Sequence, residues 1–303
     1  MQWNDLIAWI DEEKLGAVRA NEPMADHTSW RIGGPAKVMV WPEDTAACSQ
    51  LLGHCKTMGI PVAVLGYGTN LLVADEGIDA LVINTREMNW ILWQDHQVRV
   101  GAGASLAVLA GQAARRGLQG LAFSIGIPGS VGGAVLMNAG AYNGMISDVV
   151  SQVVVLDLNG GQHVLSKEDI HYGYRVSDLK KNHWFVAEAL LTLQPGDRKA
   201  LEKEMNDCLK ARKEKQPLEL PNGGSVFKNP AGEGAGRSID RAGLKGLRIG
   251  DAQVSLKHAN FIVNLGHATA KDTYTLIRTV QQRIHQQYGI FLEPEVVFWG
   301  LKE

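Results

Sequence analysis

The interval between Leu65 and Ala80 constrains the fold of this chain more than any other feature. It follows an apolar run over 62–65 and opens with Gly66-x-Gly68, but position 71 holds Leu where a dinucleotide-binding fingerprint needs its third glycine. Only 14 residues separate Leu65 from the next expected strand at 80–83. A Rossmann unit needs a crossover helix here, and this interval has no room for one. The fold is therefore not a dinucleotide-binding βαβ series.

Two interpretations of this first glycine loop stay open. The backbone N–H groups of Gly68, Thr69 and Asn70 can form a concave anion site, because glycines allow close approach and positive φ. The alternative is a tight turn between buried strands, with no ligand.

A second loop, SIGIPGSVGGAVLMNAGAYNG over 124–144, has six glycines in 21 residues. It lacks the Lys-Ser/Thr pair of a nucleotide-triphosphate loop, which disfavours ATP hydrolysis. No lysine or arginine occurs from Gly117 to Ser166. A diphosphate held here would therefore be neutralised by main-chain N–H groups and hydroxyls. The alternative is a packed hairpin in which small residues let backbones touch.

Length and charge exclude several classes of protein. At 303 residues the chain is expected to form two or three lobes that share a ligand cleft. Its net charge of -2 argues against a nucleic-acid binder. The three cysteines indicate neither a disulfide framework nor a zinc site, and no metal site is expected. No apolar run approaches the roughly 20 residues of a membrane span, so we expect a cytoplasmic protein that does not enter a membrane.

Local signals predict several elements. Asp44 can cap a helix that ends at Gly59, and Ser105 can cap one that ends at Gly117. Antiparallel strands are expected around 153–155, 164 and 185–193, and a boundary at 194–197. Further helices are expected over 201–212 and 277–288, and strands at 62–65, 80–83, 98–100 and 261–264.

The stretch GGSVFKNP over 223–230 places Ser225 behind two glycines and before a lysine and an asparagine. A nucleophilic serine on an elbow would show G-x-S-x-G, which is absent here, so a serine hydrolase is only an alternative. A serine can instead donate its proton. Its ordinary acidity is too weak for this, so neighbouring charge such as that of Lys228 must assist.

Six motifs in order resemble the UDP-N-acetylenolpyruvoylglucosamine reductase family over nearly the whole chain. They are HTSWRIGGPA (27–36), GYGTNLL (66–72), IGIPGSVGGAVLMNAGAYNG (125–144), YGYRVS (172–177), GGSVFKNP (223–230) and LEPEV (292–296). The resemblance implies an α+β chain: an FAD-binding fold of the vanillyl-alcohol-oxidase (PCMH) type in two lobes, plus a C-terminal α+β substrate-binding domain. We expect FAD-binding lobes over 1–59 and 60–196 and a substrate domain over 197–303, whose last strand packs back on the N-terminal lobe.

The resemblance also implies the cofactor and the reaction. NADPH would reduce FAD and leave, and the UDP-sugar would then enter. Because 61–72 contain neither histidine nor cysteine, non-covalent FAD is expected. The 50 residues between Arg175 and Ser225 resemble the shorter class of the family, which lacks an extra tyrosine loop. A monomer is favoured.

Three catalytic residues follow from the resemblance. Ser225 matches the serine that protonates C2 of the substrate, Arg175 the arginine that faces its carboxylate, and Glu295 the catalytic glutamate. The family often has an acidic residue after this arginine, whereas this chain has Val176. Glu293 and Glu295 can share one face of an extended segment, and only the motif selects Glu295.

The remaining expected contacts fall into two groups. The substrate group is Tyr142, Tyr174, Lys228, Asn229 and, as a weaker candidate, His258, which can equally be a core histidine. The flavin group lies in the two glycine loops and comprises Gly66, Gly68, Thr69, Asn70, Leu71, Gly126, Ile127, Pro128, Ser130, Val131, Gly132, Gly133, Asn138, Gly140 and Ala141.

Other functions stay open at this stage. An FAD-dependent oxidase of sugars or alcohols with the same fold would share both glycine loops without the set of Ser225, Arg175 and Glu295. A serine hydrolase or a nucleotide-sugar binder without catalysis would lack flavin altogether.

Overall fold

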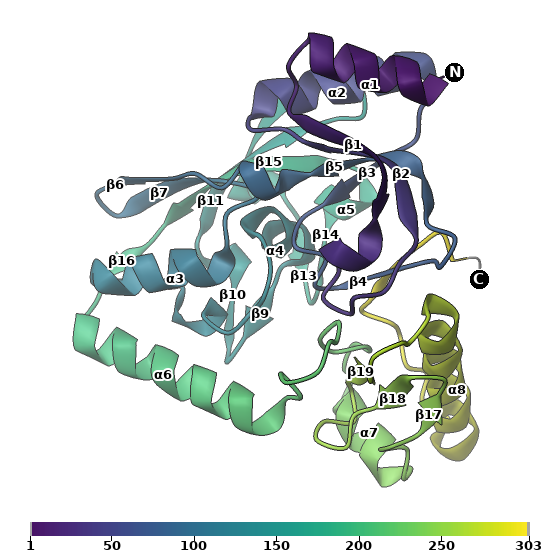
Figure 1. The fold of residues 1–303 in the computed structure, drawn as a ribbon. Coiled ribbons are helices and arrows are strands. Elements are labelled where there is room, and N and C mark those ends of the chain that lie inside the picture. The colour runs from purple at the N-terminus through teal and green to yellow at the C-terminus, as the bar shows by residue number, and fades with distance from the viewer. Residues whose placement is uncertain (1, 302–303) are drawn as a thin grey trace. The chain divides into compact units, whose positions relative to one another are not determined.

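The computed structural model describes residues 2–301, which form two compact units (Figure 1). Unit 1 comprises Met1–Asn21, Lys37–Tyr67 and Asp79–Ala211, and unit 2 comprises Glu22–Ala36, Gly68–Ile78 and Arg212–Glu303. Both units are discontinuous in sequence, and the chain passes from one to the other within the first glycine loop. The three contiguous lobes expected over 1–59, 60–196 and 197–303 stay predictions.

Unit 1 contains a four-stranded sheet with two helices packed on it. The strand order is β1-β2-β5-β3, and β3 and β5 are parallel. Apolar side chains of both helices join those of the sheet in one core. The helix of 45–58 is confirmed: the Asp44 carboxylate accepts from the Ala47 N–H group, and Gly59 ends the helix at φ +66°. The elements are α1 (Gln2–Glu12), β1 (Ala17–Pro23), β2 (Pro35–Trp41), α2 (Thr45–Met58), β3 (Val62–Leu65) and β5 (Ile78–Asn84).

A five-stranded antiparallel sheet forms the other part of unit 1. Its order is β12-β11-β15-β7-β6, and the antiparallel strands predicted around 153–155, 164 and 185–193 are present in it. Helices α3 and α4 contribute to its core, and Ser105 caps α3 as predicted. The main elements are β6 (Ile91–Gln94), β7 (Gln97–Gly101), α3 (Leu106–Arg115), α4 (Val131–Met137), β11 (Val150–Leu156), β12 (Gln162–Ser166) and β15 (Phe185–Thr192).

Short elements complete unit 1, and the helix predicted over 201–212 leads out of it. The short elements are β8 (Leu118–Gln119), β9 (Gly140–Ala141), β10 (Gly144–Met145), β13 (Tyr172–Gly173), β14 (Val176–Ser177), α5 (Asp178–Lys181) and β16 (Gln194–Pro195). The helix is α6 (Arg198–Lys215), and its last turn already belongs to unit 2.

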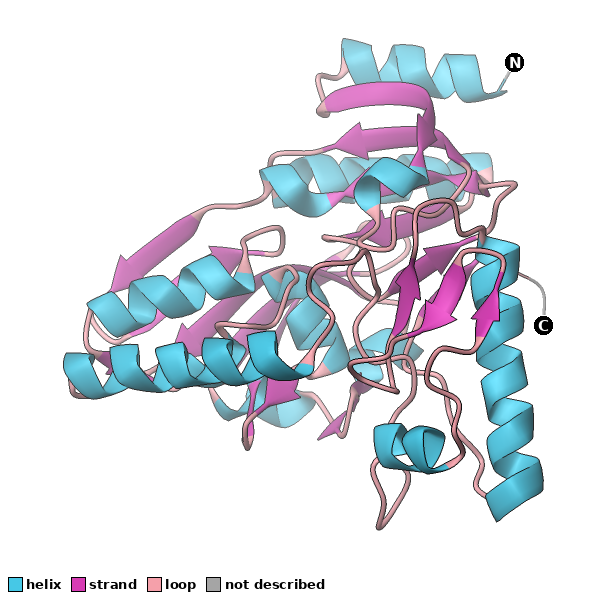
Figure 2. Ribbon diagram, turned by 60° about the horizontal axis from the view of Figure 1, so that its bottom comes forward, coloured by secondary structure: helices cyan, strands magenta, loops and turns pink. Residues whose placement is uncertain are grey.

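Unit 2 packs a long helix on a three-stranded sheet of order β17-β18-β19 (Figure 2). The helix ends at Gly289, as predicted, and begins with a capping box between Thr269 and Asp272. The last strand pairs in parallel with β4, which lies in the segment 60–196 rather than in 1–59. The elements are β4 (Leu71–Val73), α7 (Ala235–Arg241), β17 (Arg248–Ile249), β18 (Ala252–Val254), β19 (Ile262–Asn264), α8 (Ala270–Tyr288) and β20 (Val297–Trp299).

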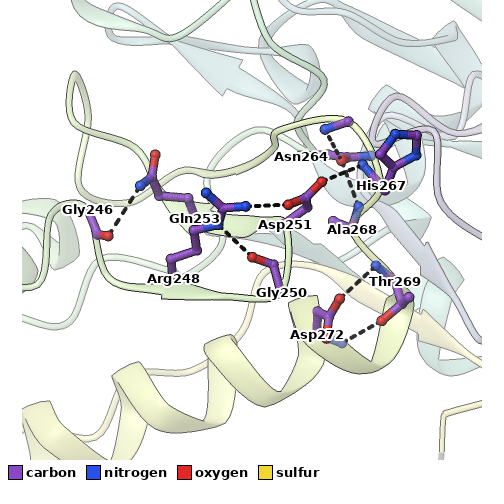
Figure 3. A network of polar contacts seen from close by, with 11 residues as sticks. Gly246, Arg248, Gly250, Asp251, Gln253, Asn264, His267, Ala268, Thr269 and Asp272 are labelled. Atoms are coloured by element: carbon purple, nitrogen blue, oxygen red, sulfur yellow. Dashed lines mark hydrogen bonds and ion pairs between the residues drawn. The ribbon is translucent and has the colours of Figure 1, made fainter.

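A polar network joins this sheet to the start of α8 (Figure 3). Arg248 pairs with Asp251, whose other carboxylate oxygen accepts from the His267 N–H group over 3.0 Å. The Asn264 side chain accepts from the Gly266 and Ala268 N–H groups. The network holds the turn between β19 and α8.

Candidate functional site

The loop that carries Ser225 is held by the buried side chain of Trp30. This indole is fully buried and donates from Nε1 to the Ile262 carbonyl over 2.8 Å. A Cβ on Gly223 would lie 2.5 Å from the ring, so only glycine fits against it. Gly224 has φ +77° in open space. Each glycine before Ser225 therefore has its own structural reason.

The motif at 27–36 supports the same loop, a role that the sequence does not reveal. The Ser29 hydroxyl donates to the Asn222 carbonyl over 2.7 Å. The Asn222 side chain in turn accepts from the Gly224 N–H group at 3.0 Å. Residues nearly 200 positions apart thus fix the approach to Ser225.

Asn260 clamps the strand that follows Ser225. Its backbone carbonyl accepts from Val226 N–H at 2.9 Å. Its side chain accepts from Phe227 N–H at 3.0 Å and donates to the Phe227 carbonyl at 2.8 Å. Because Asn260 is only 4% exposed, these bonds are shielded from water. Asn260 is not among the residues predicted from the sequence, where its one signal is a polar side chain just before an apolar strand.

The segment with Glu295 pairs antiparallel with the segment that follows Ser225. Glu295 N–H donates to Val226 O at 2.8 Å, and Lys228 N–H donates to Glu293 O at 2.9 Å. Pro294 pairs with Phe227 between these two bonds, at a position that requires no N–H donor. Glu295 therefore pairs with Val226, the residue that follows Ser225 in the chain.

The two glutamates of this segment differ in their surroundings. The Glu293 carboxylate accepts from Lys228 Nζ at 2.6 Å, and its side chain is 64% exposed. Glu295 is half-buried. The structure therefore gives Glu293 a counter-ion role toward Lys228, while the catalytic role of Glu295 stays a prediction.

Two expected substrate contacts also have structural roles. The Asn229 side chain accepts from the Ala235 N–H group at 3.0 Å, at the start of α7. His258 Nδ1 accepts from the Asn260 N–H group at 3.2 Å, and its ring packs edge-on against Phe261. Burial lowers the pKa of His258, and nearby Lys245 lowers it further. His258 thus supports the Asn260 clamp in its neutral form.

In unit 1 the two glycine loops touch at Gly66 and Ser130. A Cβ on Gly66 would lie 2.4 Å from Ser130 Oγ, so no side chain separates the loops there. The Ser130 hydroxyl accepts from Gly133 N–H and caps α4. Gly132 packs against Ala102, where a Cβ would come within 2.8 Å. Gly133, in contrast, is exposed and has no tight neighbour, so packing alone does not explain this glycine.

The first glycine loop fits an anionic group such as the diphosphate of a dinucleotide. Among residues 2–301 the structure describes no acceptor for two backbone N–H groups of this loop in unit 2, those of Gly68 and Asn70. A Cβ on Gly68 would lie 2.0 Å from the His27 carbonyl oxygen, so glycine is required there. Backbone donors without an acceptor, one of them on a glycine, suit a phosphate oxygen. The donor chemistry therefore agrees with FAD.

Arg175 and the second loop meet at a hairpin of unit 1. Tyr142 and Asn143 both have positive φ, as in a type I′ turn, and connect β9 to β10. Arg175 Nη2 donates to the Gly140 carbonyl at 2.5 Å, and its guanidinium lies over Tyr174. These contacts bring together Arg175 and the predicted substrate residues Tyr142 and Tyr174.

Asn138, an expected flavin contact, has both polar groups of its side-chain amide hydrogen-bonded within the protein. It donates to the Gly173 carbonyl at 2.9 Å and accepts from the Ser147 N–H group at 3.2 Å. Its own backbone is left-handed at the end of α4. Asn138 thereby joins the second loop to the strand that precedes Arg175.

The predicted site residues are divided between the two units. Unit 2 holds Ser225, Lys228, Asn229, His258 and Glu295 together with 68–71, and unit 1 holds Arg175, Tyr142, Tyr174 and the second glycine loop. Among the described residues no group of histidine, cysteine and carboxylate side chains could hold a metal ion. Over the same residues, every helix is too short or too polar to cross a bilayer.

Comparisons with known proteins agree along the chain. A family model described as the C-terminal domain of UDP-N-acetylenolpyruvoylglucosamine reductase matches residues 216–299. A second, described as an FAD binding domain, matches residues 36–166.

Individual relatives cover almost the whole chain. UDP-N-acetylenolpyruvoylglucosamine reductase 2 of Symbiobacterium thermophilum is 48% identical over 94% of this chain and 93% of its own length. The protein of that family from Desulforamulus reducens is 44% identical over 99% of both chains. The crystal structure of the reductase from Thermus caldophilus has a TM-score of 0.79 and 39% identity, and the match covers 93% of this chain and 98% of that one.

Proposed function

Because this chain belongs to the UDP-N-acetylenolpyruvoylglucosamine reductase family, we propose that Ser225, Glu295 and Arg175 carry out its FAD-dependent reduction of the enolpyruvyl UDP-sugar to UDP-N-acetylmuramate. The reaction serves peptidoglycan precursor synthesis, with NADPH as reductant. Membership of the family removes the hydrolase, oxidase and binder alternatives. The observation that supports the residue assignment is the backbone hydrogen bond from Glu295 to Val226, the residue next to Ser225.

FAD, when bound and reduced, supplies hydride to C3 of the enolpyruvyl group. The chain must then supply a proton to C2, where negative charge develops. The Ser225 hydroxyl suits this task because, among the described residues, it has no competing hydrogen bond. It can therefore turn toward a bound substrate.

Neighbouring charged groups are proposed to make the weakly acidic Ser225 hydroxyl an effective proton donor. The permanently charged Arg175 guanidinium is proposed to face the substrate carboxylate, into which the negative charge at C2 delocalises. Lys228 is proposed to meet substrate phosphate, and Glu295 to assist protonation at C2. Tyr142, Tyr174 and Asn229 are proposed to contact the sugar nucleotide. The two glycine loops are proposed to hold FAD non-covalently.

Three finer assignments are proposed on the sequence alone. The 50-residue interval between Arg175 and Ser225 supports the shorter class of the family. A monomer is proposed, as is a cytoplasmic location, where a nucleotide-sugar substrate would be available.

Anaerobic measurement of the two half-reactions tests the acid role. The two half-reactions are reduction of the flavin by NADPH, seen as bleaching, and its reoxidation by the enolpyruvyl UDP-sugar, seen as recolouring. For Ser225→Ala we expect bleaching at the normal rate and recolouring slower by roughly 10²- to 10⁴-fold, the range for a general acid. Ser166→Ala, which removes a hydroxyl that bonds to Asp169 in unit 1, is the control and should change neither rate. Equal loss of both half-reactions in Ser225→Ala would remove the proposed role.

A further inference from the structure

We propose that Asn70, expected from the sequence only as a flavin contact, is a positioning residue for Glu295. The inference rests on the proposed catalytic role of Glu295. Two hydrogen bonds join these parts of unit 2: Asn70 Nδ2 donates to the Glu295 carbonyl, and Val297 N–H donates to the Asn70 carbonyl, each over 3.0 Å. Asn70 thus holds the chain immediately on either side of Val296.

The hydrogen bond from the Asn70 side chain completes the set of bonds that hold the Glu295 backbone. The N–H group of Glu295 donates to Val226 O, next to Ser225, and its carbonyl accepts from Asn70. Both polar backbone groups of Glu295 are therefore bonded, one to the serine segment and one to the first glycine loop. Val296, which follows, is buried in the core of unit 2. Rotation of the peptide that carries Glu295 would break at least one of these contacts.

The chemistry of the side chain explains why asparagine suits this position. An amide can donate to a carbonyl oxygen, whereas alanine cannot, and an aspartate would place a carboxylate against that oxygen. The parallel pairing of Leu71 with Val297 continues the contact into β4 and β20. The loop of Gly68 to Leu71, whose N–H groups are proposed to hold FAD, is thereby fastened to the segment of Glu295. Cofactor binding and the position of this carboxylate are set by one loop.

Two substitutions separate positioning from cofactor binding. Asn70→Asp is nearly isosteric and removes the donor, and Asn70→Ala removes the side chain. For both we expect normal flavin content by visible absorbance and flavin reduction by NADPH within about twofold. Recolouring by the enolpyruvyl UDP-sugar should slow about ten- to a hundredfold, the effect of a misplaced catalytic group. Asn89→Asp, at an exposed position, is the control and should change none of these values.

A double substitution tests whether Asn70 acts through Glu295. Adding Asn70→Ala to Glu295→Gln should slow recolouring less than about twofold further, because residues that act as a unit are not additive. Three results would overturn the positioning role. They are rate losses of the two single variants that multiply in the double variant, loss of flavin in both Asn70 variants, and unchanged recolouring in both Asn70 variants. If Glu295→Gln alone leaves recolouring unchanged, the proposed function of Glu295 fails instead.

Discussion

Lys228 Nζ donates to Glu293 Oε1 over 2.6 Å, and the lysine side chain is the less exposed of the two, at 24% against 64%. This ion pair lies on the ladder that joins the serine segment to the segment of Glu295. Glu293 therefore places a carboxylate in direct contact with a lysine that is proposed to meet substrate phosphate. A second negative charge at this position competes with the substrate.

The first prediction concerns Glu293→Gln. Removing this charge should lower KM for the UDP-sugar about two- to fivefold, because an exposed pair contributes roughly 0.2–1 kcal/mol, and should leave kcat nearly unchanged. The effect should shrink in about 0.5 M salt, where screening is short-ranged. Steady-state kinetics at two salt concentrations measure it, with Lys228→Gln, which should raise KM, as the opposite case. A rise of KM in Glu293→Gln would mean that Glu293 orients Lys228 instead.

The second prediction concerns Gly223→Ala. The new Cβ would meet the buried ring of Trp30, so we expect a loss of about 1–3 kcal/mol in the free energy of unfolding, as for an overpacked core. Recolouring by the substrate should also slow, because the displaced loop carries Ser225. Gly224→Ala is the matched control, since its surroundings are open and only its positive φ opposes the change. Urea unfolding of both variants compares the costs, and equal costs would contradict a specific clash with Trp30.

Local signals account for most of the fold that the sequence predicts. Asp44 and Gly59 bracket α2, and Gly289 ends α8, because a cap depends on side-chain and backbone chemistry within one turn. The interval after Leu65 is too short for a crossover helix, and the structure has β4 and the start of β5 there and no helix. Helix α4 escaped prediction because Gly132 and Gly133 weaken its helical signal.

The supports of the candidate site are not local, and this explains why they were missed. Trp30 and Gly223 are separated by most of the chain, as are Asn70 and Glu295. Asn260 carries no periodic or capping signal, and its role depends on which strand folds beside it. The motifs identify Ser225 and Glu295, whereas the contacts that hold them require the folded chain.

The third prediction is a dependence of stability on pH that arises from His258. Its pKa is lowered in the folded protein, chiefly by burial, and protonation would also remove the acceptor for Asn260 N–H. The unfolded chain therefore binds a proton at His258 more readily than the folded one. The stabilisation by neutral His258 is full above the unfolded pKa of about 6.5 and declines as the pH falls toward the lowered folded value.

Urea unfolding between about pH 5 and 7.5 measures this dependence. His258→Gln should flatten the curve below about pH 6.5, whereas His96→Gln, at an exposed position, should reproduce the slope of the unmodified protein. An unchanged slope in His258→Gln would show that other groups cause the decline.

The fourth prediction concerns Arg175→Lys. Arg175 already donates from Nη2 to the Gly140 carbonyl, so its planar guanidinium can hold the hairpin and offer further N–H groups to a carboxylate. A lysine ammonium cannot reproduce this fork, although it keeps the charge. We expect flavin content and reduction by NADPH to persist, and recolouring by the enolpyruvyl UDP-sugar to slow by about 10²-fold, the lower end of the range for a lost charge-stabilising donor. Arg99→Lys, which changes an exposed arginine paired with the buried Glu188 in the same unit, is the matched control and should leave both half-reactions unchanged. If the flavin of Arg175→Lys is recoloured by the substrate at the normal rate, positive charge alone is sufficient. A bidentate hydrogen bond from Arg175 to the substrate carboxylate would then be wrong.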